Sequence, residues 1–593
     1  MAKSLLRSEE GRGREGAENR PGSAAGHSPA GGPEPEVTEL ARRHETLLEE
    51  RRSWEPDWKK LAAQFLPRKC RLESEAGAET NRGGLRGGTL DSTAFYAMRD
   101  LAAGLHGGMT SPARPWFSLT LQDRELAKRA RIRQWLDALA DRMRAIFNQS
   151  NFYTAIHSLY LELGTFGTGF LFALEDERGP GAVRFLPLTA GEYCLDANDQ
   201  GRVDTIFRTT MMTVRQMIMR FGAKVPEFIR EMGRRPELWN ERFAVVHAVY
   251  PRGNVRGAGP FASAYYLDSG VSGGRRSGPA DSRLPFLLER GKFSEFPGFG
   301  VRWDVTGGDV YGKSPGMDAL PSSIMLQQMT RTMLMALQKE VDPPMIAPAG
   351  LENVSLLPGA VTFVNDVTGQ GQQVYPAMRM NYAVAETAQV IAAFQEQVRE
   401  GLFNSLFRML TNSDRRNVTA TEIAAKEEEK LILVGPVLER LHAELFIPLI
   451  DRVFSIMARR NLLPPDWPDD LDNAPLRVEF VSILAQAQKM VATGSLEKFA
   501  GFVGSTAQVY SEALDAVNAD ALVDNYAEYL GVEANVLRGQ DDREALREAR
   551  QQARQQMDAL QQGAAGADML RKLGGLRLEG TAAGALAGGG GGV

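Results

Sequence analysis

The residues best suited to chemistry crowd into one short stretch, AAGLHGGMTSPARPWFSL, at positions 102–119. Glycine, proline and arginine at the end of a predicted helix are typical of either a phosphate-binding loop or a rigid corner. A G-x-x-x-x-G-K-[ST] loop needs a lysine that this stretch lacks, and it precedes a helix where this stretch follows one. We therefore predict a structural turn, built from Gly107, Gly108, Pro112, Arg114, Pro115 and Trp116.

The rest of the sequence lacks a recognisable catalytic or metal-binding set. GTFGTG at 164–169 departs from the G-x-G-x-x-G dinucleotide pattern and precedes a predicted strand where a dinucleotide fold has a helix. Neither G-x-S-x-G nor H-E-x-x-H occurs, and the six histidines have no cysteine or carboxylate at ligand spacing. We expect no enzymatic activity, no cofactor and no metal.

One polar segment, TNSDRRNV at 411–418, separates two long predicted helices. It is too polar to be buried, so it is either an ordinary exposed loop or a set of guanidinium and amide groups that faces a polyanion. Arginine suits the second role because its planar fork matches phosphate oxygens. The residues concerned are Asn412, Arg415, Arg416 and Asn417.

The composition limits the class of protein. A formal net charge of −5 over 593 residues argues against a protein that coats nucleic acid by bulk attraction, although DNA can pass such a protein without sticking. Only two cysteines occur, which indicates a reducing compartment rather than a disulfide framework. We find no apolar run of membrane-spanning length and no signal-peptide core at the N-terminus, so we expect no membrane association.

The hydrophobic pattern changes along the chain. Polar, Gly/Pro-rich composition predicts disorder at the N-terminus, and Gly/Ala-rich composition predicts a flexible C-terminal tail. Period-2 runs broken by Gly, Asn and Pro predict a strand-rich region, and helical periodicity dominates before and after it. The predicted helices cover residues 37–66, 91–109, 122–149, 213–221, 314–339, 381–410, 419–461 and parts of 486–562, and the strands lie mainly within 164–303.

The two helices at 314–339 and 381–410 enclose about 40 residues with too little apolar content for a core of their own. They therefore form a projecting hairpin, and this hairpin carries apolar residues on more than one face. The economical way to cover them is to pack copies of the hairpin side by side, and a closed ring leaves no open end. The longest helix, 419–461, contains Pro436 and Pro448, which should kink it.

Several segments of unusual composition resemble the head-to-tail connector, or portal, proteins of short-tailed bacterial viruses. They stand in the family's order and cover about residues 37–495. At LPSSIMLQQM the chain departs from the family, which more often has a charged, asparagine-bearing helix start there. The matching segments are DLAAGLHGGMTSPARPWFSL, LYLELGTFGTGFLF, RWDVTGGDVYGKSPGMDALPS, VDPPMIAP, NVTATEIAAKEEEKLILVGPVLERL, IPLIDRVFSIMARRNLLPP and VEFVSILAQAQK.

The resemblance implies an α+β, mainly helical portal fold that assembles as a ring. It divides the chain into a disordered segment (1–36), an α/β wing (37–313), a first stem helix (314–340), a clip (341–380), a second stem helix (381–410), a tunnel loop (411–418), a long kinked helix with a wing strand (419–485), a helical crown (486–562) and a disordered tail (563–593). In this reading Arg114 makes a structural ion pair or a subunit contact and is no phosphate ligand.

The function implied is a ring of twelve copies at one capsid vertex of the virion, made in the host bacterial cytoplasm, through which double-stranded DNA is packaged and ejected without sequence specificity. The implied partners are the large terminase subunit, a tail adaptor or head-completion protein, and the major capsid and scaffolding proteins. The tunnel loop would face the DNA. The clip would dock terminase and adaptor through Pro343, Pro344, Leu351, Glu352 and Asn353.

Two other readings stay open from the residues alone. An unrelated ring-forming tail or baseplate protein would share the lack of catalytic groups but would not need a hairpin with a central loop. A nucleic-acid enzyme would need acidic residues grouped around a compact α/β core, which the sequence does not indicate.

Overall fold

The structure of the chain is a computed structural model. The chain divides into two compact units, which are described separately: unit 1 comprises Met1–Ser118, Leu139–Pro465 and Val478–Ser495, and unit 2 the remainder. The structure describes residues 35–67, 89–123, 126, 129–176, 179, 181–252, 260–272, 285–346, 375–376, 384–405, 434–465, 467–468, 476–480, 496–508, 510–530 and 542–557.

The largest sheet of unit 1 has five antiparallel strands whose order in space, β4-β5-β6-β7-β8, is also their order in the chain. Each strand thus pairs with the next strand along the chain, which makes the sheet a meander. The strands are β4 (Tyr193–Ala197), β5 (Val203–Thr213), β6 (Arg242–Pro251), β7 (Phe261–Ser272) and β8 (Phe286–Phe293).

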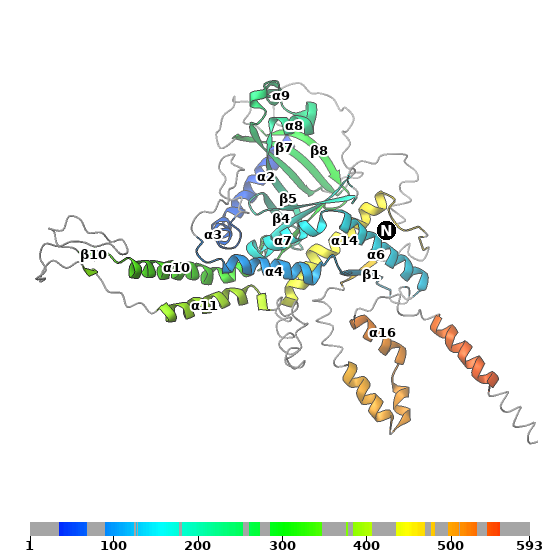
Figure 1. Ribbon diagram of the computed structural model, residues 1–593. Coiled ribbons are helices and arrows are strands. Elements are labelled where there is room, and N and C mark those ends of the chain that lie inside the picture. Colours follow the sequence, from blue (N-terminus) through cyan, green and yellow to red (C-terminus); the bar gives the residue numbers. More distant parts are fainter. Residues whose placement is uncertain are drawn as a thin grey trace, which may run out of the picture. The chain divides into compact units, whose positions relative to one another are not determined.

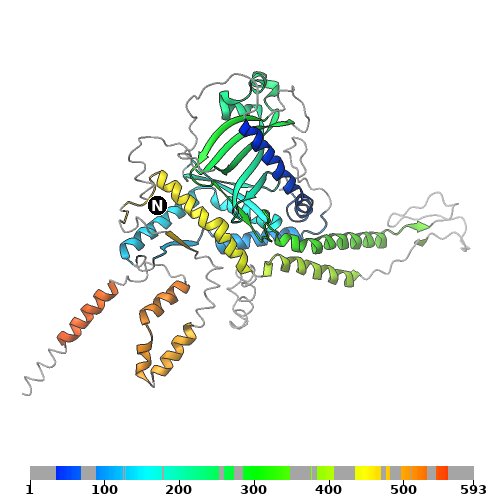
Figure 2. The same cartoon turned by 180° about the vertical axis from the view of Figure 1, so that it is seen from behind.

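Helices cover both faces of this sheet (Figure 1 and Figure 2). Alternate residues of a strand point to opposite faces, and in β6 Val246 packs with α2 (Pro35–Arg52) whereas Val245 packs with α8 (Val214–Phe221) and α9 (Glu227–Gly233). The helix predicted at 213–221 is confirmed. Thr213 is its N-cap, in a capping box with Gln216.

A second sheet, of order β3-β2-β9, is also antiparallel. It consists of β2 (Thr168–Glu175), β3 (Val183–Leu188) and β9 (Gly298–Arg302). The helix α7 (Phe152–Phe166) runs into β2 through Gly167, whose φ of +75° lies in the left-handed region. A Cβ at Gly167 would collide with the carbonyl oxygen of Gly312, so only glycine fits this turn.

The helix α10 (Pro315–Val341) and the helix α11 (Val384–Gly401) lie side by side and project together from the rest of unit 1 (Figure 1). The Ser314 hydroxyl caps α10 by accepting the N–H of Met317 at 3.0 Å. Beyond the helices, β10 (Met345–Ile346) pairs with β11 (Tyr375–Pro376). At its base α10 packs on α7 and on α3 (Glu55–Phe65), and α11 packs on α4 (Thr93–Met109).

The long helix predicted at 419–461 is described from residue 434 onward. Residues 434–441 are α-helical, His442–Phe446 form a π-helical turn, and α14 (Ile447–Arg459) follows. Pro448 has no N–H with which to continue the α-helical ladder, and the N–H of Ile447 instead bonds the carbonyl of His442, five residues back. The kink predicted at Pro448 therefore coincides with a π turn.

Two predicted helix starts need correction. The helix predicted from 91 begins at Thr93, and Asp91 accepts the N–H of Thr93 at 2.7 Å from a position one residue before the N-cap Ser92. The helix predicted from 122 is observed as α6 (Ala130–Gln149), which follows β1 (Phe117–Leu121). β1 pairs with β12 (Leu476–Phe480) in a two-stranded sheet.

Among its described residues, unit 2 contains helical segments at 496–507 and 542–557, a 3-10 turn at Ser511–Ala516 and α16 (Ala519–Leu530). Polar contacts join them: Tyr526 donates to Glu497 at 2.7 Å, and Arg543 pairs with Asp524 at 3.0 Å. The fold is thus mainly helical with antiparallel sheets, as the sequence predicts.

Candidate functional site

The turn that follows α4 is built differently from the prediction. Gly107 and Gly108 lie inside the last turn of α4, which ends at Met109, so their assignment to the turn is wrong. Neither has a positive φ. The turn begins at Thr110, the C-cap residue, whose N–H bonds the carbonyl of His106 at 3.1 Å.

Trp116 is the anchor of this turn. Only 2% of its surface is exposed, and its ring stacks on Phe152 with centroids 5.9 Å apart and an interplanar angle of 14°. It also contacts the rings of Phe117, Phe147 and Phe446. The burial of these large rings holds the chain between α4 and β1 against α7 and the π turn.

The other residues assigned to this turn do not form a ligand-binding site. Pro112, Arg114 and Pro115 are exposed. Arg114 was expected to make a structural ion pair or a subunit contact, and within the described residues the structure contains no ion pair for it. A single exposed guanidinium beside a buried tryptophan does not make a phosphate site, so the corner reading describes this stretch better.

The predicted channel and docking residues are only partly described. Pro343 and Pro344 lie between the end of α10 and β10, the first half-buried and the second exposed. The remaining members of these two sets fall outside the described residues: Leu351, Glu352 and Asn353 of the clip, and Asn412, Arg415, Arg416 and Asn417 of the tunnel loop.

The hairpin of α10 and α11 exposes large apolar side chains. On α10, Ile324, Met325, Leu334 and Met335 are each between 42% and 47% exposed, and Val341 at its end is 85% exposed. On α11, Val390 is 45% exposed. Water-facing side chains of this size along one projecting element are typical of a protein–protein contact.

Two glutamines fasten the base of the hairpin, and we call this arrangement the base clamp. The side-chain oxygen of Gln327 accepts the N–H groups of Leu90 and Asp91 at 2.8 and 3.1 Å, and its amide donates to the carbonyl of Asp91 at 2.6 Å. From α11, Gln395 donates to the Asp91 carboxylate at 2.7 Å. Both hairpin helices are therefore tied to the segment that leads into α4.

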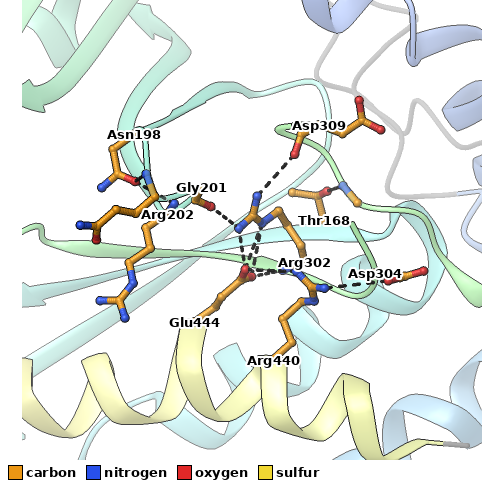
Figure 3. Close-up of polar contacts among 11 residues, drawn as sticks. Thr168, Asn198, Gly201, Arg202, Arg302, Asp304, Asp309, Arg440 and Glu444 are labelled. Carbon is orange, nitrogen blue, oxygen red and sulfur yellow. Dashed lines mark hydrogen bonds and ion pairs between the residues drawn. The ribbon is translucent and has the colours of Figure 1, made fainter. Parts of the chain in front are cut away.

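A second polar cluster joins β9 to the π turn, and Figure 3 shows it in close-up. We call it the polar lock; its members are Arg302, Asp304, Arg440 and Glu444. The Glu444 carboxylate accepts the backbone N–H of Arg302 at 2.9 Å and its guanidinium at 2.6 Å. Arg440 lies 3.8 Å from Glu444 and 3.9 Å from Asp304.

Two members of the lock, Arg302 and Glu444, are buried, and the Arg302 guanidinium is well satisfied. The side chains of Arg302 and Glu444 are 5% and 13% exposed, and the guanidinium also donates to the carbonyl of Gly201 at 2.6 Å. A buried charge is tolerated only when it is paired and hydrogen-bonded. The Arg302–Glu444 pair therefore constrains the position of β9 and its sheet relative to the long helix.

Neither cluster was predicted from the sequence, although the sequence contains signals for the lock. Arg302 ends the apolar strand GFGVR, and Glu444 sits in the apolar run LHAELFIPLI. A lone charge in such a run needs a partner of opposite sign. Gln327 and Gln395 carry no comparable signal, because glutamine is common on exposed helix faces.

The described residues contain no group of three or more His, Cys, Asp or Glu side chains arranged to hold a metal ion. None of the helices in the described ranges is long and apolar enough to span a membrane. What unit 1 offers is a projecting, partly apolar hairpin, which is suited to assembly.

Comparison with known proteins agrees with this picture. Residues 37–537 match the family described as "Bacteriophage head to tail connecting protein". The chain is 37% identical over 554 residues to the "Portal protein" of Salmonella phage epsilon15, a match that covers 91% of this chain and 96% of that protein. It is 36% identical over 547 residues to the "Probable portal protein" of Bordetella phage BPP-1, which covers 90% and 95%.

Among solved structures, a chain from the "Neck of empty GTA particle computed with C6 symmetry" matches 68% of this chain and 86% of its own length, at 12% identity. Its TM-score of 0.30 is too low to establish a common fold. The family match covers most of the sequence, and both curated relatives align over nearly their full lengths. The chain therefore belongs to the bacteriophage head-to-tail connecting protein family, the portal proteins of tailed phages, which are structural components of the virion.

Proposed function

We propose that twelve copies of this chain form a closed ring at one vertex of a tailed-phage capsid. In that ring the channel along the axis admits double-stranded DNA during packaging and releases it during ejection, and the major capsid and scaffolding proteins surround it. The chain is made in the host bacterial cytoplasm and acts there before it becomes part of the virion. The observation that carries the proposal is the apolar surface of the hairpin.

The position of the exposed side chains around α10 favours a ring over a pair. Met325 and Leu334 are nine positions apart, which at roughly 100° per residue puts them about 180° apart, on opposite flanks of the helix. Both are exposed. One neighbour covers one flank, so two neighbours are needed to cover both. A repeated contact of this head-to-tail kind closes as a ring when the rotation per copy is right.

The test is the assembly state of the purified full-length chain. We expect rings of twelve with a central hole in electron micrographs, and a matching mass in solution. Met325→Glu with Leu334→Glu should reduce the product to monomers and short arcs, because each flank then buries a carboxylate without a partner. Gln200→Glu with Asn240→Glu adds the same charge at exposed polar positions outside the hairpin and should still give rings.

A wild-type chain that stays monomeric at micromolar concentration would contradict the proposal. Open tubes or sixfold discs would instead indicate another ring-forming tail or baseplate protein. ATP turnover or DNA cleavage by this chain alone would favour an enzyme.

Within the ring, we assign DNA contact to Asn412, Arg415, Arg416 and Asn417. One such loop offers a weak contact, whereas many copies around an axis form a collar of positive charge. Arg415→Glu with Arg416→Glu should leave ring assembly intact and reduce packaging or DNA retention. Unchanged length and yield of packaged DNA would rule the collar out.

We assign docking of the large terminase subunit, and later of the tail adaptor, to the clip around Pro343, Pro344, Leu351, Glu352 and Asn353. The two described members of this set, Pro343 and Pro344, follow the end of α10 at Val341. Deletion of residues 351–358 should abolish terminase binding while rings still form. Normal terminase binding by that variant would exclude the docking role.

A further inference from the structure

The helical segment at 542–557 in unit 2 carries its arginines on one side. Arg543, Arg547, Arg550 and Arg554 follow one another at steps of four, three and four residues. At roughly 100° per residue these steps keep all four within an arc of about 60°. The acidic residues of the segment, Asp542, Glu544 and Glu548, fall outside that arc.

The first two arginines are neutralised inside unit 2. Arg543 pairs with Asp524 of α16 at 3.0 Å, and it lies 3.8 Å from Asp520. Arg547 pairs with Asp520 at 2.6 Å. Arg543 and Arg547 therefore hold the segment to α16, and their positive charge is already compensated.

The second half is not compensated. Arg550 and Arg554 are exposed, and among the described residues neither makes an ion pair. No acidic residue occurs between 549 and 557. The neighbours are four glutamines, at positions 551, 552, 555 and 556, and all of them are exposed. This end of the segment therefore presents two guanidinium groups and several amide donors to solvent.

We propose that residues 550–556 bind the phosphate backbone of double-stranded DNA, without reading its sequence. The inference rests on the proposed function and adds a contact to it, outside the tunnel loop. Arginine and glutamine side chains both donate to phosphate oxygens, and such contacts position a duplex without specifying its bases.

The chemistry of the surface favours DNA over a protein partner. The cores of protein interfaces are apolar and depleted in charge, whereas the large apolar side chain of this stretch is limited to Met557 at its end. A duplex requires only positive charge and hydrogen-bond donors at a surface that water reaches.

The interaction should also be weak, because two arginines per copy on exposed side chains are readily screened by salt. Such contacts form and break quickly, which agrees with DNA that must move past the protein. A larger, less exposed cluster of arginines, each bound to a phosphate, would instead hold the duplex in place.

The test uses the full-length chain and a labelled 60-base-pair duplex, with binding followed by fluorescence anisotropy over a series of salt concentrations. Arg550→Gln with Arg554→Gln should weaken binding at low salt by about tenfold. It should also make the dependence of log Kd on log salt less steep, by about one unit for each phosphate that the variant no longer binds. The matched control is Arg234→Gln with Arg235→Gln, which removes the same charge from two exposed arginines of unit 1 and should leave binding unchanged.

Equal DNA affinity of the wild type and the 550/554 variant would overturn the proposal. Ring formation is measured on the same samples, so a wild type that forms no rings contradicts the proposed function whatever the DNA result. If the 550/554 variant loses both ring formation and DNA binding, Arg550→Lys with Arg554→Lys distinguishes a contact to DNA from a contact to another copy of the chain. Phosphate binding tolerates lysine, whereas a bidentate contact to a carboxylate of another copy does not. Rings and DNA affinity within about twofold of wild type support the proposal, and failure of the lysine variant overturns it.

Discussion

Glu444, in the π turn, binds Arg302, 142 residues earlier in the chain, through both the backbone N–H and the guanidinium of that arginine. The contact joins the end of β9 to the long helix at the point where Pro448 prevents a regular α-helical bond. One residue pair thus fixes two elements that are remote in sequence.

We expect Glu444→Ala to lower the free energy of unfolding by about 3–5 kcal/mol, because it leaves Arg302 buried without a countercharge. Urea or thermal denaturation measures the change. Glu439→Ala, an exposed glutamate on the same helix, is the control and should have little effect. The double variant Arg302→Met with Glu444→Leu should recover most of the loss, and a double variant as unstable as Glu444→Ala would show that charge burial is not the cause.

Trp116→Ala should destabilise unit 1 by about 3–5 kcal/mol, since it empties the space among the rings of Phe117, Phe147 and Phe152. Arg114→Ala, two residues earlier and exposed, should leave the thermal midpoint unchanged. If phosphate binding were the role of this stretch, Arg114→Ala would instead lower anion affinity at unchanged stability.

Gln327→Ala should loosen the base of the hairpin, because Leu90 and Asp91 lose the side-chain acceptor of their N–H groups. We expect a local loss of about 1–2 kcal/mol, seen as faster amide hydrogen exchange at these two residues. Gln328→Ala, the exposed neighbour, is the matched control. Equal exchange in both variants would exclude a role for the base clamp in holding the hairpin.

The stability of unit 1 should fall with acid partly through His44. Its ring stacks on Phe207 with centroids 5.4 Å apart, and burial, assisted by the charge of Arg51, lowers the pKa of His44 from 6.5 to about 4. The unfolded chain takes up this proton as the pH falls below about 6.5, whereas the folded chain stays neutral there. The contribution is therefore complete above pH 6.5 and is lost between pH 6.5 and 4, by up to about 1.4 kcal/mol per pH unit.

His44→Phe removes this proton uptake and keeps the ring stack. Compared at pH 8, where both side chains are neutral, the two proteins should differ little. As the pH is lowered to 4, the thermal midpoint of the variant should rise relative to that of the wild type. Parallel curves over that range would mean that His44 is not protonated preferentially in the unfolded chain.

Local patterns were enough to predict much of the secondary structure. The helical patterns of residues 213–221 and 314–339 depend on neighbours within a few residues, and the structure has helices at both places. The two glycines before the turn misled the prediction, since glycine ends many helices but also fits within one. Gly108 is buried in α4.

The long-range contacts could not be predicted from the sequence, because no local rule pairs Arg302 with Glu444 or Gln327 with Asp91. The first pair shows only as two charges in apolar runs, and the second shows no signal. Such pairs follow from how sheets and helices pack, which depends on the whole chain.

The opposite flanks of α10 carry one more implication for how the proposed ring grows. A subunit that binds a neighbour on each of two flanks cannot cover both flanks by forming a dimer. Every incomplete arc therefore keeps one uncovered flank at each end until the ring closes. A copy damaged on one flank alone still joins an arc by its sound flank and then halts further addition. A small fraction of such copies therefore stops many intact copies from completing a ring. Variants altered on one flank alone should act as dominant inhibitors of assembly in a mixed infection.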